Sequence, residues 1–159
     1  MPASSDIAIQ EAATSEHIEA VRVLIREYAA SLDIDLCFQG LSEELAQLPG
    51  AYVPPRGRLL LAVGAEGQAG CVALRPLTDQ VCEMKRLYVR PHCRGRGLGT
   101  ALAQRVILEA QAAGYSTMLL DTLASMQTAI RIYRALGFRP RPAYHPTPLP
   151  HTVFLERRL

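Results

Sequence analysis

The clearest chemical signal in this sequence is a short loop in which arginines alternate with glycines. Residues 94–99 read Arg-Gly-Arg-Gly-Leu-Gly, and an amphipathic stretch begins at Leu98. Glycines allow a tight turn whose backbone N–H groups point inward, and a helix that starts there adds the positive end of its dipole. The arginine side chains add full positive charges. The loop is therefore predicted to bind a pyrophosphate, with the candidate contacts Arg94, Gly95, Arg96, Gly97, Leu98, Gly99 and Thr100.

Two other kinds of phosphate-binding loop are alternatives for the same residues. A P-loop ends in Gly-Lys-Ser or Gly-Lys-Thr, whereas residues 97–100 read Gly-Leu-Gly-Thr and hold no lysine. A dinucleotide-binding fingerprint needs a third small residue where Thr100 lies. The P-loop is excluded, but Asp121, at the end of the next expected strand, leaves the dinucleotide alternative open.

A third loop type matches without a mismatch. Residues 94–99 fit the Arg/Gln-x-x-Gly-x-Gly/Ala signature of the GNAT N-acetyltransferase superfamily, which the chain resembles over nearly its whole length. The segments CEMKRLYV before the loop and LLLDT after the following helix occur in the family's order, and TAIRIYRALGFRP looks like its second helix and next strand. In that family the loop holds the pyrophosphate of coenzyme A. The resemblance implies an acetyl-CoA-dependent N-acetyltransferase.

The length of 159 residues indicates a single domain over residues 1–159, and apolar periodicity indicates its strands and helices. Thr14 or Ser15 can cap the first helix. The order strand, loop, helix, strand over residues 81–121 requires a right-handed crossover between parallel strands, which places a ligand at their carboxyl ends. Strands are predicted at 7–9, 59–63, 70–75, 81–89, 117–121 and 144–155, and helices at 15–28, 41–48, 98–113 and 126–136.

The resemblance also implies the fold, an α/β (α+β) architecture with helices on both faces of the sheet. Its central sheet is mixed, mostly antiparallel, and splayed at one parallel strand pair. The pantetheine arm of the coenzyme would run along the central strand beside Leu87, Tyr88 and Val89. A bulge in this strand near Leu87 would leave an amide free to polarise the acetyl carbonyl.

Two residues are candidates for acid–base catalysis. Amine acetylation needs an acceptor for the amine proton and a donor for the departing thiolate. Glu83 lies on the central strand where family members often carry a catalytic glutamate, although a strand glutamate can also face solvent or pair with Lys85. Tyr133 matches the tyrosine that in many GNAT enzymes protonates the thiolate, although it can also simply pack against the sheet.

The acceptor pocket and one contact to the coenzyme are less defined by sequence. Many family members have an asparagine seven residues before the tyrosine, where this chain has Met126, so we expect packing there in place of a polar contact. Arg86 suits an acceptor with a carboxylate or a structural ion pair. The candidate substrate contacts are Tyr28, Phe38, Gln39, Arg86 and Tyr144.

Composition excludes several other function classes. The net charge of +2 is too small to indicate a nucleic acid partner. No stretch approaches the roughly 20 apolar residues of a membrane span, and the first residues do not resemble a signal peptide, so we expect a cytoplasmic protein without a membrane partner. Neither the cysteines nor His145 and His151 have metal-ligand spacing, so free thiols and no metal are predicted.

The predicted function is direct transfer of an acetyl group from acetyl-CoA to a primary amine, with a small molecule as the acceptor. A protein or peptide acceptor is the nearest alternative. A catalytically silent module that binds coenzyme A for regulation is a further one. A homodimer is permitted but not required.

Overall fold

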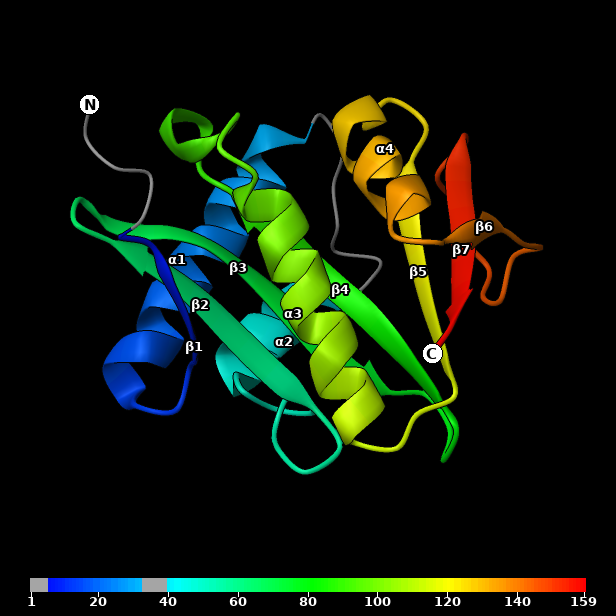
Figure 1. Ribbon diagram of the computed structural model, residues 1–159, viewed down its shortest axis with the longest axis horizontal. Helices are drawn as coiled ribbons and strands as arrows, with labels where there is room; N and C mark the ends of the chain where they lie inside the picture. The colour runs from blue at the N-terminus through cyan, green and yellow to red at the C-terminus, as the bar shows by residue number, and fades with distance from the viewer. Residues whose placement is uncertain (1–5, 33–39) are drawn as a thin grey trace.

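The computed structural model describes residues 6–32 and 40–159. Within them, seven strands form one sheet in the order β1-β2-β3-β4-β5-β7-β6 (Figure 1). The strands are β1 (Ala8–Glu11), β2 (Arg58–Gly64), β3 (Gly67–Pro76), β4 (Val81–Val89), β5 (Thr117–Leu123), β6 (Arg139–Pro140) and β7 (Thr152–Arg158). The helices are α1 (Ser15–Ser31), α2 (Leu41–Gln47), the 3₁₀ turn η2 (Pro91–Cys93), α3 (Leu98–Ala112) and α4 (Gln127–Ala135).

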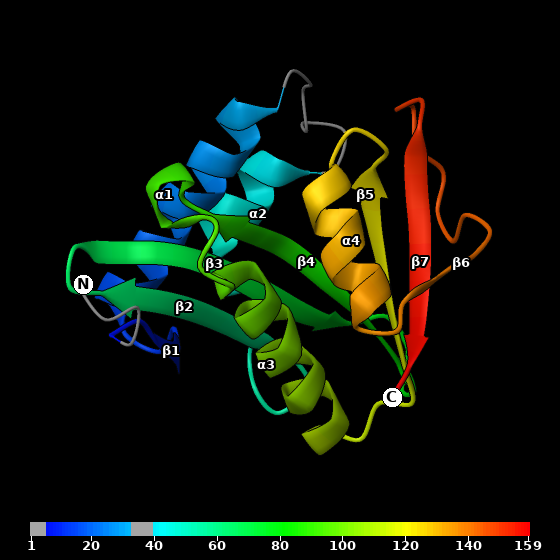
Figure 2. The same cartoon turned by 45° about the horizontal axis from the view of Figure 1, so that its top comes forward.

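The sheet is splayed between its two central strands. All neighbouring strands are antiparallel except β4 and β5, which are parallel. These two strands pair only from Val81↔Thr117 to Glu83↔Leu119. Figure 2 shows them separating toward their carboxyl ends. The mixed, mostly antiparallel sheet with one splayed parallel pair is therefore confirmed.

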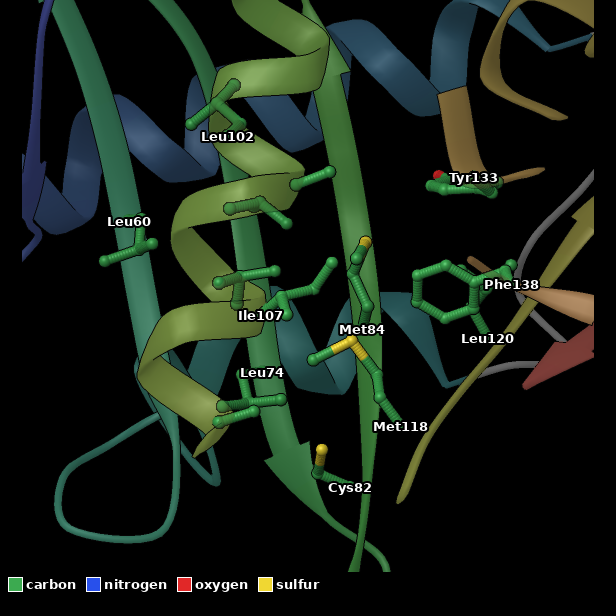
Figure 3. Close-up of a cluster of buried hydrophobic side chains, with 14 of the residues drawn as sticks. Leu60, Leu74, Cys82, Met84, Leu102, Ile107, Met118, Leu120, Tyr133 and Phe138 are labelled. Carbon is green, nitrogen blue, oxygen red and sulfur yellow. The ribbon is translucent and has the colours of Figure 1, made fainter. Parts of the chain in front are cut away.

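Helices cover both faces of the sheet, and the strand sequences show why. Leu59, Leu60, Leu61 and Ala62 of β2 are all buried. Leu60 and Ala62 pack in the cluster under α3, whereas Leu59 and Leu61 pack with α1 on the opposite face. Because side chains alternate along a strand, a continuous apolar run of this kind needs cover on both sides. Figure 3 shows part of the cluster under α3.

Local signals account for the helix ends. The side chain of Thr14 caps α1 by accepting a hydrogen bond of 3.1 Å from the backbone N–H of His17, as predicted. None of the described helices is both long and apolar enough to cross a membrane. Cys71, Cys82 and Cys93 are buried free thiols, and Cys37 lies outside the described residues.

The prediction of one strand over residues 144–155 is wrong. The strand β7 begins only at Thr152 and continues to Arg158, and the two-residue strand β6 pairs with it. Prolines at 142, 146, 148 and 150 have no N–H to donate to a neighbouring strand, so the segment before β7 stays irregular. That irregular segment contributes side chains to the candidate site.

Candidate active site

The loop between β4 and α3 leaves the first turn of α3 open. Gly95 and Gly97 both have φ of +79°, a left-handed conformation that favours glycine. No side chain caps α3 at its N-cap residue Gly97, so the amides of the first turn keep free donors. A Cβ atom added at either glycine would meet no atom within 4 Å. The loop therefore combines open space with unpaired backbone N–H groups, as pyrophosphate binding requires.

A cavity of about 520 Å³, here called the larger cavity, lies against this loop. Arg94 is part of its wall and is oriented by a hydrogen bond of 2.9 Å from its Nε to the carbonyl oxygen of Val89. Arg96 is exposed and outside the lining, so its contact with a ligand stays a prediction. The predicted coenzyme contacts that line the larger cavity are Leu87, Tyr88, Val89, Arg94, Gly95, Gly97, Leu98, Gly99 and Thr100.

The strand β4 contains a bulge at Arg86 and Leu87. The β3–β4 register shifts between Cys71↔Tyr88 and Ala73↔Lys85, so these two residues of β4 lie opposite one residue of β3. Arg86 has φ of +61°, a value that non-glycine residues rarely adopt. The predicted bulge is confirmed. Because a bulge leaves part of the strand ladder unpaired, an amide near Leu87 is a candidate donor to a ligand carbonyl.

A second cavity, of about 60 Å³ and here called the smaller cavity, adjoins the first. Tyr28, Leu87 and Met126 line both cavities. The rest of the smaller cavity's wall includes Lys85, Arg86, Asp121 and Tyr133. The two cavities therefore lie side by side at the bulge, with Leu87 in the wall of both.

Tyr133 projects from α4 into the wall of the smaller cavity. Its ring packs edge-on against Phe138, with 5.8 Å between the ring centres (Figure 3). Burial raises the pKa of Tyr133 above its usual value, which keeps the hydroxyl protonated. Within the described residues no group hydrogen-bonds this hydroxyl, so it keeps its proton for a ligand.

Glu83 is buried, with 1% of its surface exposed, and it lines neither cavity. Its Oε1 accepts a hydrogen bond of 2.7 Å from Nε of Arg75, and its Oε2 accepts one of 2.5 Å from the hydroxyl of Tyr144. The Lys85 Nζ is 4.0 Å away. Glu83 therefore does not face solvent, and Arg75 is a closer partner than Lys85. Its role as a proton acceptor stays a prediction, and the burial favours a route through water.

Tyr144 and His145, here called the carboxylate clasp, bind one carboxylate from each of the separating strands. Tyr144 binds Glu83 of β4, and Nε2 of His145 lies 2.5 Å from Oδ2 of Asp121 on β5. Nδ1 of His145 lies 2.8 Å from the carbonyl oxygen of Pro146. Because both ring nitrogens face oxygen acceptors, the protonated ring, which has two N–H donors, is favoured. Burial alone would lower the pKa of His145, but these two bonds outweigh it and raise the pKa above its usual value.

The same residues have the spacing of a metal site. Ligand atoms of Glu83, Asp121 and His145 all lie within 4.8 Å of one another. Metal ligands must be deprotonated, whereas both ring nitrogens of His145 face oxygen acceptors and Glu83 is bound by Arg75 and Tyr144. The arrangement is therefore a hydrogen-bonded acid–base network, and the expected lack of a metal stays a prediction.

Only some of the predicted substrate contacts line the smaller cavity. Tyr28 and Arg86 line the smaller cavity, whereas Tyr144 does not. Arg86 forms two bonds to Glu44 of α2, with Nε to Oε2 at 2.9 Å and Nη2 to Oε1 at 3.1 Å. Phe38 and Gln39 lie outside the described residues.

Similarity to known proteins decides the family. A family model for an acetyltransferase (GNAT) domain matches residues 55–140. The chain belongs to the GNAT family of acetyltransferases. An uncharacterized N-acetyltransferase of Schizosaccharomyces pombe is 38% identical over 154 residues, which cover 96% of this chain and 94% of that protein. This GNAT protein is thus an N-acetyltransferase, and the dinucleotide-binding alternative is wrong.

Two further similarities extend over much of the GNAT chain. An IAA acetyltransferase of Azospirillum brasilense is 37% identical over 107 residues, covering 66% of this chain and 70% of that protein. A GNAT acetyltransferase from Elizabethkingia anophelis, whose crystal structure holds acetyl-CoA, has a TM-score of 0.67 at 20% identity. That alignment covers 98% of this chain and 99% of that one. The shared fold therefore extends beyond the matched GNAT domain.

The site fits coenzyme A, the cosubstrate that the GNAT family implies. The open amides at Gly97, the empty space at Gly95 and the positive charge of Arg94 suit a pyrophosphate. Met126 replaces the asparagine of many GNAT members and lines both cavities, where its thioether accepts a bond of 3.6 Å from the Thr122 hydroxyl. This position agrees with packing against the coenzyme arm.

Sequence reasoning missed two charged groups on the wall of the smaller cavity. From the sequence, Asp121 stands out only as a mark of a dinucleotide site, and Lys85 only as a partner for Glu83. One signal is available: Lys85 is the only lysine in the chain, and it lies in the predicted central strand, two residues before Leu87.

Proposed function

We propose that this N-acetyltransferase moves an acetyl group from acetyl-CoA directly to the primary amine of a small molecule. The meeting of the two cavities beside the bulge supports this proposal most strongly. The larger cavity leads from the phosphate loop to Leu87, and the smaller one continues from Leu87 to Tyr133. A cosubstrate in the first and an amine in the second would meet at the strand that carries the candidate carbonyl-polarising amide.

The size and composition of the smaller cavity support a small acceptor over a protein. Its volume of about 60 Å³ suits a few non-hydrogen atoms, and charged groups from both β4 and β5 line it. The name of the similar Azospirillum brasilense protein, IAA acetyltransferase, points the same way. A peptide acceptor would need an open groove along the surface.

The chain's own residues suit the proton transfers of this reaction. Coenzyme A supplies the acetyl thioester. Tyr133 holds a proton at its hydroxyl within the cavity wall and is positioned to donate it to the departing thiolate. Glu83 would take up the amine proton through water, since its carboxylate lies behind the wall. The amide near Leu87 would bind the carbonyl oxygen as charge develops on it.

Titration calorimetry with acetyl-CoA and coenzyme A tests the site. We expect the wild-type protein to bind acetyl-CoA with micromolar affinity. Gly97→Asp places a side chain and a negative charge in the space left for the pyrophosphate, and we expect it to abolish this binding. Gly67→Asp is a matched control, because Gly67 also has a positive φ, of +107°, and open space but lies at the start of β3, outside both cavities.

Activity then separates the possible acceptors. Thiol release with small amines supports the proposal, whereas release only with peptides favours a protein acceptor. If acetyl-CoA binds but no amine or peptide is acetylated, the protein is a regulatory module. If a folded protein binds neither acetyl-CoA nor coenzyme A, the assignment of the loop is wrong.

A further inference from the structure

Lys85 is a buried cation beside the smaller cavity. Its side chain is 10% exposed, and it lines the cavity together with Asp121 and Tyr133. Within the described residues its nearest carboxylate oxygen is Oε1 of Glu83 at 4.0 Å, which is beyond hydrogen-bond distance. No other described group forms a hydrogen bond with its Nζ. A buried ammonium of this kind loses water contacts, and the ion pair with Glu83 at 4.0 Å replaces them only in part.

The carboxylates around the smaller cavity already form ion pairs with cations other than Lys85. Each has a cation closer than 4.0 Å, and the resulting hydrogen-bonded pairs are Glu83–Arg75, Glu44–Arg86 and Asp121–His145. Tyr144 also occupies the second oxygen of Glu83. Lys85 is thus the cation on this wall whose donors stay available to a ligand.

Electrostatics agrees with an anion as that ligand. Burial lowers the pKa of Lys85, because its charged form is poorly hydrated, and the nearby Glu83 offsets this only in part. An anion in the smaller cavity would restore a partner to the ammonium. A neutral amine alone would leave the ammonium as it is.

We propose that Lys85 binds a carboxylate of the acceptor, so that the substrates of this enzyme are small amines that also carry a carboxylate, such as amino acids. The inference rests on the proposed function and specifies its substrate class. Lys85 lies two residues before Leu87 on β4, and both residues line the smaller cavity. A molecule with its amine and carboxylate a few bonds apart can direct the amine to the bulge and the carboxylate to Lys85.

Matched pairs of amines test this inference by thiol release with saturating acetyl-CoA. The pairs are glycine and glycinamide, β-alanine and β-alaninamide, and 4-aminobutyrate and 4-aminobutyramide. We expect the wild type to acetylate at least one acid with a higher kcat/KM than its amide. In Lys85→Gln the KM for that acid should rise about 10- to 100-fold, the loss expected for one hydrogen bond between charged groups, while the KM for the amide changes little.

Two further variants separate anchoring from other roles. Lys85→Arg keeps the charge and should retain part of the preference for the acid. Arg131→Gln removes one positive charge from an exposed position on α4 and should leave the preference unchanged. Calorimetry with coenzyme A verifies that each variant is folded.

Several outcomes would overturn the inference. An equal fall in kcat for acid and amide in Lys85→Gln would mean that Lys85 moves a proton or supports the structure and does not bind a carboxylate. If the wild type prefers amides or simple amines, the inference fails while the proposed function stands. If the wild type acetylates none of these amines, the inference fails, and the wider assay with other amines and peptides decides the proposed function. The comparison in wild type decides the question even if Lys85→Gln does not fold.

Discussion

Removing the hydroxyl of Tyr144 should destabilise the fold through Glu83. The Tyr144 hydroxyl donates a hydrogen bond of 2.5 Å to Oε2 of Glu83, whose side chain is 2% exposed. Burial and the nearby carboxylate raise the pKa of Tyr144, so the hydroxyl stays protonated and keeps donating. In Tyr144→Phe the ring remains, but one oxygen of a buried carboxylate loses its donor.

The size of the effect follows from the charge on the hydrogen-bond acceptor. A hydrogen bond to a charged group contributes about 1.5 to 3 kcal/mol, whereas one between neutral groups contributes about 0.5 to 1.5 kcal/mol. For a chain of 159 residues, each kcal/mol shifts Tm by about 2 to 4 °C. Tyr144→Phe should therefore lower Tm by about 3 to 12 °C.

A matched control exists in the same protein. Tyr115 is also buried, and its hydroxyl donates a hydrogen bond of 2.6 Å to a neutral acceptor, the carbonyl oxygen of Arg56. Urea unfolding of both variants at neutral pH gives the two losses in free energy directly. If Tyr144→Phe costs no more than Tyr115→Phe, the bond to Glu83 contributes less than its burial implies, and the reasoning is refuted.

Two further predictions concern the other side chains of the site. Tyr133→Phe should lower kcat about 100-fold or more, because it removes the proposed proton donor. The Tm should change little, because the Tyr133 hydroxyl has no hydrogen-bond partner among the described residues. An unchanged kcat in thiol-release assays would exclude Tyr133 as the proton donor. The pKa of His145 is raised in the folded protein, so its bond to Asp121 stabilises the fold fully below about pH 6.5, the usual pKa of histidine. This contribution is lost as the pH rises through the pKa of His145 in the folded protein. Urea unfolding from pH 6 to pH 9 should show this loss in wild type but not in His145→Gln, and parallel curves would contradict it.

The phosphate loop was predictable because its determinants are local. Six consecutive residues, 94–99, account for the loop. They include Gly95 and Gly97, which have positive φ angles, and Leu98, where an uncapped helix begins. The strands and helices on either side follow from apolar periodicity over short windows. The order of these elements then places the loop at the carboxyl end of β4 without further tertiary information.

The surroundings of Glu83 were only partly predictable. Arg75 lies directly opposite Glu83 in the β3–β4 pairing, and the short turn between the two strands could have indicated this cross-strand pair. Tyr144 is 61 residues away from Glu83 in sequence, and its proline-rich segment shows neither the helix nor the strand period of apolar residues. No local pattern predicts that contact.

The bulge explains why simple alternation fails along β4. One extra residue reverses the direction of every later side chain. Met84 therefore packs in the cluster under α3 together with Leu87 and Val89, while Tyr88 turns to the α1 side. A reading with period two would have placed Leu87 on the opposite face from Met84. The residues that meet the larger cavity are thus set by an irregularity that the sequence pattern does not encode.

The opening for substrate and the burial of charged groups have the same structural origin. Because β4 and β5 stop pairing after Glu83 and Leu119, the residues beyond that point lose the neighbouring strand that would otherwise cover them. The carboxylate clasp fills part of this gap and gives Glu83 and Asp121 their hydrogen bonds, one on each strand. Lys85 lies just past the last paired residue of β4 and has no such partner from the clasp. The part of the gap that protein side chains leave open therefore faces an ammonium whose nearest described carboxylate, Glu83, is 4.0 Å away, which supports the proposal of an anionic acceptor.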